Sequence, residues 1–423
     1  MSKVKRVERH FIKANHKFYS ECGRLALASK NLFNYAQYNC RQSFIYGYDL
    51  PSLSQLNTLL KDTPQYQALP AKVSQLVLKQ VCDAWQSYFK SLQEYKISPS
   101  KFTGKPKNPG YALERNLVKF NYQALSKTEF QKNRLLKPSK TNIFIGVSAN
   151  INFDDINEVR IVPKVGGYVI EVVYDVTEFI NPRESGIVAA IDLGLDNLAT
   201  VAFNQAGLQP IIINGKPLKA VNQFWNKRRS LLQSLLITGI VKSQQLDNLT
   251  CYRNNYVDNY LHQSTKKLVT EFVRLGVSKV AIGNNKGWKF QSNMGKKSNQ
   301  KFVQIPHQRF IEILTYKCQN LGITVIVSEE SYTSKASYLD WDNIPTYNPN
   351  CTEKHIFSGK RIARSWYKSA DGILIHADVN GALNIGRKVF PMDFVRRDRG
   401  CLVVHPRRIT PVSVPVRETI GVA

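Results

Sequence analysis

Short apolar runs alternate with long amphipathic segments from residue 186 to about residue 390, and this alternation restricts the fold more than any other feature. The run 187–191 is predicted to be a buried strand and the runs 278–282 and 323–328 to be further strands, and the segments between them repeat apolar residues at helical spacing. Strands that alternate with helices favour parallel pairing in an α/β sheet. The predicted order is two strands joined by a turn after residue 186, helices at about 221–240 and 251–275, the strand 278–282, a helix at 306–320, the strand 323–328 and a final helix beginning near Asp378.

The first 185 residues have a different pattern. Residues 16–95 carry apolar and aromatic residues at helical spacing and are predicted to be helical. From residue 98 to residue 140, prolines and glycines interrupt a lysine-rich stretch, which predicts a basic loop with extended backbone. Two runs of alternating residues flank Gly166 and Gly167 and predict a β-hairpin. The chain is therefore expected to have at least two domains, with a boundary near residue 185.

The chain carries a large positive charge. Lys and Arg total 59 against 31 Asp and Glu, a formal net charge of +28, although only 21% of the residues are charged and 43% are hydrophobic. A folded protein with this net charge has a positive electrostatic field. Such a field favours a polyanionic partner, either nucleic acid or an acidic membrane surface. No apolar stretch approaches the length of a membrane span, and no signal sequence follows the basic N-terminus. We therefore expect a cytoplasmic protein that binds nucleic acid and does not enter a membrane.

The seven cysteines are far apart and never spaced as C-x-x-C. This pattern does not favour a disulfide framework. Several of the cysteines lie in helical patterns, where cysteine is an ordinary small core residue.

Asp192 and Asp378 are the acids best placed to carry chemistry. Asp192 follows five apolar residues at the end of a predicted strand, and Asp378 begins the last predicted helix. Ligands of α/β sheets bind beyond the carboxyl ends of the strands, where Asp192 is expected. Each acid also has a structural interpretation, because Asp is common in turns and at helix N-caps.

Four segments together resemble the TnpB (OrfB) family of transposon-encoded proteins: IDLGLDNLATVA, HADVNGALNIGRKV, LPAKVSQLVLKQVCDAWQSYFKSL and PSKFTGKPKNPGY. Members of this family are RNA-guided DNA endonucleases with a RuvC-type, RNase H-like fold, related to the type V CRISPR effectors. The resemblance implies an α+β multidomain protein. Its expected parts are a β-barrel-like wedge in residues 1–185 with a helical recognition insert at about 16–105, a RuvC α/β domain in residues 186–390, a target-nucleic-acid-binding insertion in residues 331–375 and a basic tail in residues 391–423.

The resemblance also implies partners and cofactors. They are a guide RNA transcribed from the transposon end, double-stranded target DNA with a short adjacent motif, and two Mg²⁺ ions. The oligomeric state is open, with a monomer bound to RNA favoured. Such a protein is expected in the cytoplasm of a prokaryotic cell, associated with the nucleoid when it is on its target.

Cleavage in the family uses three acids, because two Mg²⁺ ions about 4 Å apart need several carboxylates to hold both. By the resemblance, Asp192 matches the first acid and Asp378 the third. The position of the middle acid is occupied by Gly283, which is followed by Asn284 and Asn285. Neutral amides are weak substitutes for a charged Mg²⁺ ligand.

Glu329 and Glu330 end the next predicted strand and are candidates for the missing ligand. Neighbouring strands lie about 4.8 Å apart, so a Glu at the adjacent strand end could reach the space that Gly283 leaves. Alternation places the two side chains on opposite faces, so only one should point to the metals. We favour Glu330, because the chain leaves the strand there. The alternative is that both are surface acids and the nuclease is inactive.

Many relatives carry a zinc ribbon of two C-x-x-C pairs before the final helix. Here only Cys351, His355 and His376 could bind a metal in that segment, and their spacing fits no tetrahedral pattern. We therefore predict no zinc site. An aromatic core is expected to take its place, made of Trp341, Tyr347, Phe357 and Trp366.

Several basic, amide and aromatic residues are candidates for contact with nucleic acid. Each could instead be a solvated or packed side chain. The basic tail, with the motif HPRRITP, is expected to be disordered or to become ordered on RNA. The candidates are Lys72, Gln75 and Lys79 for the adjacent motif, Lys101 and Lys105 in the basic loop, Arg228, Arg229 and His262 for the guide–target duplex, and Trp288 and Lys289 for single-stranded DNA.

Two functions remain open. The first is an RNA-guided, Mg²⁺-dependent DNA endonuclease whose metal ligands are Asp192, Asp378 and one of the two glutamates. The second is an RNA-guided DNA-binding protein whose nuclease site is inactive. A strand-joining transposase is disfavoured, because no Tyr or Ser nucleophile motif is evident.

Overall fold

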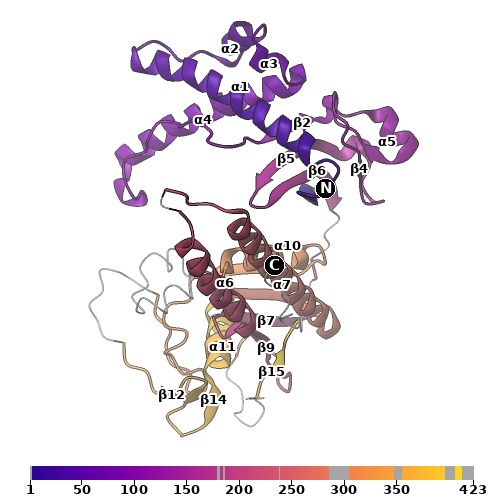
Figure 1. Ribbon diagram of the computed structural model, residues 1–423. Coiled ribbons are helices and arrows are strands. Elements are labelled where there is room, and N and C mark those ends of the chain that lie inside the picture. The colour runs from indigo at the N-terminus through magenta and orange to yellow at the C-terminus, as the bar shows by residue number, and fades with distance from the viewer. Residues whose placement is uncertain are drawn as a thin grey trace. The chain divides into compact units, whose positions relative to one another are not determined.

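The chain divides into two compact units, residues 1–179 and residues 180–423. The computed structural model describes residues 2–178, 182–183, 186–237, 239–284, 304–346, 355–395 and 405–411. Figure 1 shows both units as ribbons, and each unit is described by itself. No helix in the described ranges is long and apolar enough to cross a membrane. The five cysteines within those ranges are free thiols.

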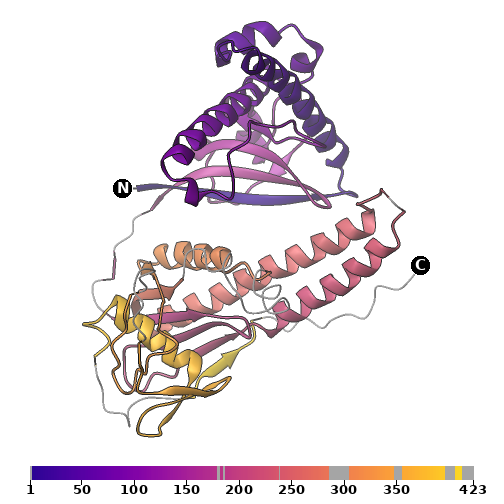
Figure 2. The ribbon, with the colours of Figure 1, turned by 90° about the vertical axis from the view of Figure 1, so that its left-hand side faces the viewer.

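Helices make up most of the first hundred residues, as predicted. The two long helices bury apolar residues at helical spacing, among them Leu25 and Leu32 on one and Val77 and Trp85 on the other. These side chains lie in a single core that also includes residues of the neighbouring sheet. Figure 2 shows the ribbons of the helices and of this sheet. The helices are α1 (Tyr19–Ile45), α2 (Leu53–Leu60), α3 (Pro64–Gln67) and α4 (Ala71–Ile97).

Four antiparallel strands complete the core of the N-terminal unit. Their order is β1 (Ser2–Lys13), β6 (Gly167–Glu178), β5 (Ile156–Lys164) and β2 (Val118–Asn121). The hairpin predicted around Gly166 and Gly167 is confirmed as β5–β6. Among the described residues, β1 and β2 are the edges of an open sheet, so this unit shows no closed barrel.

The basic stretch after α4 is only partly a loop. Residues 102–117 have irregular backbone, as predicted for a segment rich in proline and glycine. Regular structure then resumes before residue 140, which the loop prediction missed. It comprises β2, α5 (Lys127–Asn133) and β3 (Leu135–Leu136), which pairs with β4 (Ile145–Gly146).

A six-stranded mixed sheet forms the centre of the second unit. Strands β7, β8 and β9 are antiparallel neighbours, and β10 and β11 continue the sheet parallel to β7. This architecture is compatible with the RuvC-containing fold expected from the sequence. The order is β11 (Thr324–Ser328), β10 (Val277–Gly283), β7 (Ile187–Leu193), β8 (Asn197–Phe203), β9 (Ile211–Asn214) and β15 (Arg407–Ile409).

Helices cover both faces of this sheet. Alternate residues of β7 face opposite layers: Ala189 and Ile191 pack with α7 and α10, whereas Val188 and Ala190 pack with α11. Asp192 continues the second set, so its side chain points to the α11 face. The helices are α6 (Lys216–Ser234), α7 (Gln244–Leu275), α10 (His307–Gln319) and α11 (Ala377–Val389).

The insertion before α11 contains a small antiparallel sheet of β12 (Lys360–Ala363), β13 (Trp366–Lys368) and β14 (Leu374–His376). The aromatic core predicted here is largely wrong. Trp341 does pack against the α11 layer, but Phe357 and Trp366 contact Tyr332 and His405 instead. Tyr347 lies outside the described residues. The buried residues that pack in the α11 layer include Tyr338, Leu339, Tyr367 and Ile375.

Part of the C-terminal tail belongs to the sheet. Arg407, Arg408 and Ile409 pair in parallel with Ile211, Ile212 and Ile213 of β9. Backbone pairing therefore orders this part of the HPRRITP motif without RNA, contrary to the prediction.

Candidate active site

Asp192 lies near the carboxyl end of β7, one of the two central strands of the mixed sheet. The residue is partly buried, and its carboxyl group faces the first turns of α11. A Cβ atom added at Gly381 of α11 would lie 2.8 Å from Asp192 Oδ2. Glycine at position 381 therefore allows the helix to approach this carboxylate.

Asp378 lies in the first turn of α11, where the His376 side chain caps the helix by accepting a hydrogen bond from the Asp378 backbone amide. Asn197 of β8 donates a hydrogen bond to Asp378 Oδ2 at 2.6 Å. The Arg361 guanidinium of β12 lies 3.6 Å from Asp378 Oδ1. Both carboxylate oxygens of Asp378 therefore have polar neighbours.

The carboxyl group of Glu330 occupies the space that a side chain at Gly283 would fill. A Cβ atom added at Gly283 would overlap Glu330 Oε2 and would lie 3.1 Å from Glu330 Cβ and 2.6 Å from Ile385 Cδ1. Strand pairing explains the proximity, because Gly283 is aligned with Ser328 at the ends of β10 and β11. Glu330, which follows the neighbouring strand, thus lies in the side-chain space of Gly283.

Glu329 has a different environment. Its carboxylate forms an ion pair with Lys388 of α11, and Glu329 Oε1 accepts a hydrogen bond from the Ser331 amide at 2.5 Å. These interactions hold the pKa of Glu329 below its ordinary value, against partial burial. The two neighbouring glutamates therefore have different surroundings. Glu329 pairs with Lys388, and Glu330 lies beside Gly283.

Burial and like charge shift the ionisation of the site. Burial raises the pKa of Asp192 well above its ordinary value, and Asp378 and Glu330 add repulsion. Burial and the charge of Glu329 raise the pKa of Glu330 to about 7. Burial lowers the pKa of the His376 imidazole. A cation among the acids would favour their charged forms.

The donor set fits a hard divalent cation, since Mg²⁺ prefers carboxylate oxygens. The negative charges of Asp378 and Glu330 repel that of Asp192. A bound divalent cation would offset this repulsion. Within the described ranges, however, no three His, Cys, Asp or Glu side chains are gathered closely enough to form a ready metal site. Asp378 is instead in contact with Arg361 and Asn197.

The zinc candidates do not share a site in the described residues. His355 packs edge to face against Tyr332, with ring centroids 4.9 Å apart, and His376 is the buried cap of α11. Cys351 lies outside the described residues.

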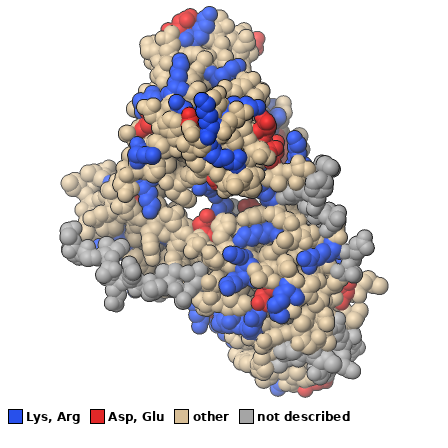
Figure 3. Space-filling model, turned by 90° about the vertical axis from the view of Figure 1, so that its right-hand side faces the viewer, with Lys and Arg blue, Asp and Glu red and all other residues tan. Residues whose placement is uncertain are grey.

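Most predicted contacts of the N-terminal unit are exposed. Lys72 and Lys79 lie on the exposed face of α4, whereas Gln75 is partly buried and hydrogen-bonds the Tyr66 side chain. In the basic loop Lys105 is exposed, and Lys101 pairs with Glu94 at 2.5 Å. Lysine and arginine side chains are widely spread over the face drawn in Figure 3.

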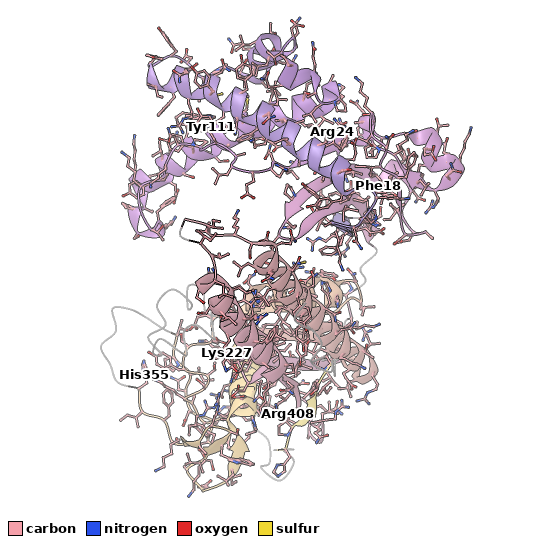
Figure 4. All side chains as sticks on the ribbon, in the orientation of Figure 1. Phe18, Arg24, Tyr111, Lys227, His355 and Arg408 are labelled. Atoms are coloured by element: carbon pink, nitrogen blue, oxygen red, sulfur yellow. The ribbon has the colours of Figure 1, made fainter. Side chains whose placement is uncertain are left out.

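The nucleic-acid contacts predicted in the second unit differ in their exposure. Arg228 and Arg229 are exposed on α6, next to Lys227, which is labelled in Figure 4. The Arg229 guanidinium lies 4.9 Å from the Trp225 ring centroid. The His262 side chain of α7 is 39% exposed and lies 3.9 Å from Asp258. Trp288 and Lys289 lie outside the described residues.

Sequence reasoning missed Asn197, Arg361 and Lys388, which contact the candidate acids. The sequence could have indicated Asn197, because it belongs to the same motif as Asp192. No sequence pattern indicates Arg361 or Lys388, since each reaches its acid only through tertiary packing.

Comparisons with known proteins agree with this architecture. The family model OrfB_IS605, described as "Probable transposase", matches residues 171–289, and the model of the Cas12f1-like TNB domain matches residues 307–385. The TnpB-like protein ORF457 of Acidianus two-tailed virus is 22% identical over 439 residues, which cover 92% of this chain and 88% of the relative.

Two solved structures are similar over most of their length. The mini-RNA-guided endonuclease CRISPR-Cas_phi3 aligns with a TM-score of 0.51 and 10% identity, over 91% of this chain and 92% of that one. The Cas12f1–sgRNA–target DNA complex aligns with a TM-score of 0.49 and 16% identity, over 87% and 82%.

The fold is thus that of a mixed α+β protein, compatible with the RuvC-containing class. The two family models and the viral relative together support a TnpB-family protein.

Proposed function

We propose that this protein is an RNA-guided DNA endonuclease. It would carry a guide RNA derived from the transposon end, recognise duplex DNA beside a short motif, and hydrolyse a phosphodiester bond with Mg²⁺. Family membership supports the class of activity, and the net charge of +28 supports two polyanionic partners. A monomer bound to RNA would act on DNA in the cytoplasm.

The observation that carries the proposal is the position of Glu330. Its carboxyl group fills the side-chain space of Gly283 and interacts electrostatically with Asp192. Asp192, Glu330 and Asp378 would hold the Mg²⁺ ions. Two bound Mg²⁺ ions would supply an activated water and charge stabilisation at the scissile phosphate.

The other polar residues of the site would act on Asp378. Asn197 orients one of its oxygens through the 2.6 Å hydrogen bond. Arg361 contacts the other oxygen from an exposed position, where ion pairs contribute little stability. Arg361 would therefore release Asp378 readily when metal and DNA enter.

Nucleic-acid contacts would be divided between the units. Lys72, Gln75 and Lys79 would contact the adjacent motif, and Lys101 and Lys105 would contact backbone phosphates. Arg228, Arg229 and His262 would contact the guide–target duplex, and Trp288 and Lys289 the displaced strand. Guided effectors divide recognition in this way, since base pairing reads the target.

The second candidate is an RNA-guided DNA-binding protein that does not cut. Gly283 in place of the middle acid favours it, as does the absence of an assembled three-residue metal site in the described residues. The two candidates share every partner and differ only in the chemistry.

The test uses the full-length protein with its cognate RNA, a target with the correct adjacent motif, and Mg²⁺. We expect target cleavage that EDTA abolishes. Sequence-specific binding without cleavage would instead establish the second candidate.

Single substitutions then locate the third ligand. Glu330→Ala should abolish cleavage and leave guided DNA binding intact, because it removes a proposed metal ligand. Glu329→Ala is the comparison variant and should still cleave at saturating Mg²⁺, because Glu329 is not a proposed metal ligand. Full activity in both variants would refute the relocation of the acid.

A further inference from the structure

Helix α11 holds the segment after β11 through a row of three side chains. Asn380, Asn384 and Lys388 are spaced four residues apart and therefore lie on one helix face. Each of them bonds to part of the segment 329–338. Asp378 is on the same helix, so a single element carries one acid and contacts the segment that carries another.

Two asparagines hold the far end of this segment. Asn380 donates to the Ala336 carbonyl at 2.8 Å and accepts from the Tyr338 amide at 2.9 Å. Asn384 donates to the carbonyls of Thr333 and Ala336 at 2.8 Å and 2.7 Å. Both asparagines are fully buried, where such hydrogen bonds are costly to lose.

Lys388 holds the near end, next to Glu330. Its ammonium forms an ion pair with Glu329 and donates to the Ser331 carbonyl at 3.4 Å. The Lys388 side chain is 14% exposed and that of Glu329 is 37% exposed, so this contact is partly shielded from solvent. Because successive side chains of an extended chain point to opposite sides, holding Glu329 at Lys388 directs Glu330 toward Gly283.

The backbone of Glu330 is fixed on its other side as well. The Glu330 carbonyl accepts hydrogen bonds from the Thr333 hydroxyl at 2.8 Å and the Thr333 amide at 3.3 Å. The Thr333 carbonyl is in turn the acceptor of Asn384. The contacts of α11 thus flank the glutamate on both sides along the chain.

We propose that Lys388 is a positioning residue for the relocated acid: its ion pair with Glu329 orients Glu330 into the side-chain space of Gly283. This inference rests on the proposed function, because it assumes that Glu330 is a metal ligand. Residues that orient metal ligands typically change metal affinity about 10- to 100-fold when they are replaced.

The experiment measures metal affinity with and without turnover. Mn²⁺ binding to the protein–RNA complex without target DNA is followed by electron paramagnetic resonance, and the Mg²⁺ concentration for half-maximal cleavage is determined separately. Lys388→Met should weaken Mn²⁺ binding and raise the Mg²⁺ requirement about 10- to 100-fold. Lys388→Arg should stay near wild type, because it keeps the ion pair.

Breaking the same pair from the other side gives a second variant. Glu329→Gln should reproduce the shift of Lys388→Met, and the charge exchange Glu329→Lys with Lys388→Glu should restore most of the affinity. Lys279→Met is the matched control, since it breaks a lysine–aspartate pair with Asp393 at 3.3 Å outside the acid cluster. It should leave both metal measurements unchanged.

The outcomes separate this inference from the proposed function. If Glu330→Gln abolishes cleavage but Glu329→Gln and Lys388→Met keep wild-type metal affinity, Lys388 is no positioning residue and the proposed ligand stands. A charge exchange no better than Lys388→Met would also overturn the inference. If Glu330→Gln keeps full activity, the relocated ligand itself is wrong.

Discussion

The buried carboxyl group of Glu330 should destabilise the metal-free protein at neutral and higher pH. Its pKa is raised from the ordinary value of 4.5 to about 7, mainly by burial and then by the charge of Glu329. A raised pKa means that ionisation opposes folding. Since one pKa unit corresponds to about 1.4 kcal/mol, the charged form costs about 3 kcal/mol of folding free energy.

Glu330→Gln tests this value, because glutamine resembles the protonated carboxyl group. Below pH 4.5 the two proteins should be equally stable, since Glu330 is protonated in both the folded and unfolded states. As the pH rises from 4.5 to about 7, the wild type becomes progressively less stable than the variant, because the ionised form of Glu330 is disfavoured in the folded state. Above that value the variant should be more stable by up to about 3 kcal/mol.

Urea unfolding in EDTA at pH 4.5 and pH 8, followed by tryptophan fluorescence, measures the difference. Four of the five tryptophans lie after residue 180, so the signal reports mainly on the unit that contains the acids. A stability difference that is the same at both pH values, or a less stable variant at pH 8, would refute the reasoning.

Glu329→Gln is the control, and its effect should have the opposite sign. The hydrogen bonds and charge of Lys388 lower the pKa of Glu329, so its ionised form stabilises the fold. That contribution is present above pH 4.5 and is lost as the pH falls through the lowered pKa. The glutamine variant should therefore be less stable than wild type at pH 8.

Three further predictions concern other contacts of the protein. Gly283→Ala should cost about 1–3 kcal/mol through overpacking against Glu330, and adding Glu330→Ala should recover part of that loss in a double-mutant cycle; strict additivity would contradict the shared space. Arg361→Gln should lower the Mg²⁺ concentration needed for half-maximal cleavage, because it frees an oxygen of Asp378; an unchanged requirement would show that this ion pair does not compete with metal. Replacing Arg228 and Arg229 together by Gln should reduce the slope of log affinity against log salt by about two if both contact backbone phosphates, whereas an unchanged slope would exclude them.

Much of the second unit could be predicted from the sequence because its signals are local. The strands β7, β10 and β11 and the helices α10 and α11 lie close to their predicted positions. Apolar periodicity reports which face of each element is buried, whatever its neighbours are. The same pattern placed Asp192 at the end of a strand and Asp378 at the start of a helix.

The charged contacts of the candidate acids were not predicted, because the partners are distant in sequence. Lys388 pairs with Glu329, 59 residues earlier in the chain. The HPRRITP motif has the composition of a disordered tail, yet β9 offers it a free edge of backbone groups. Residue composition alone does not predict such partners.

The sequence by itself determined that Gly283 ends one strand and that two glutamates follow the next, and the family resemblance predicted an acid at Gly283. Only the tertiary structure decided which of the two glutamates lies beside Gly283. Pairing of β10 with β11 brings the strand ends together, while Lys388 of α11 holds Glu329 and leaves the space at Gly283 to Glu330. The physical reason is that this choice depends on the sheet register and on a helix about 60 residues further along the chain, and local periodicity contains neither.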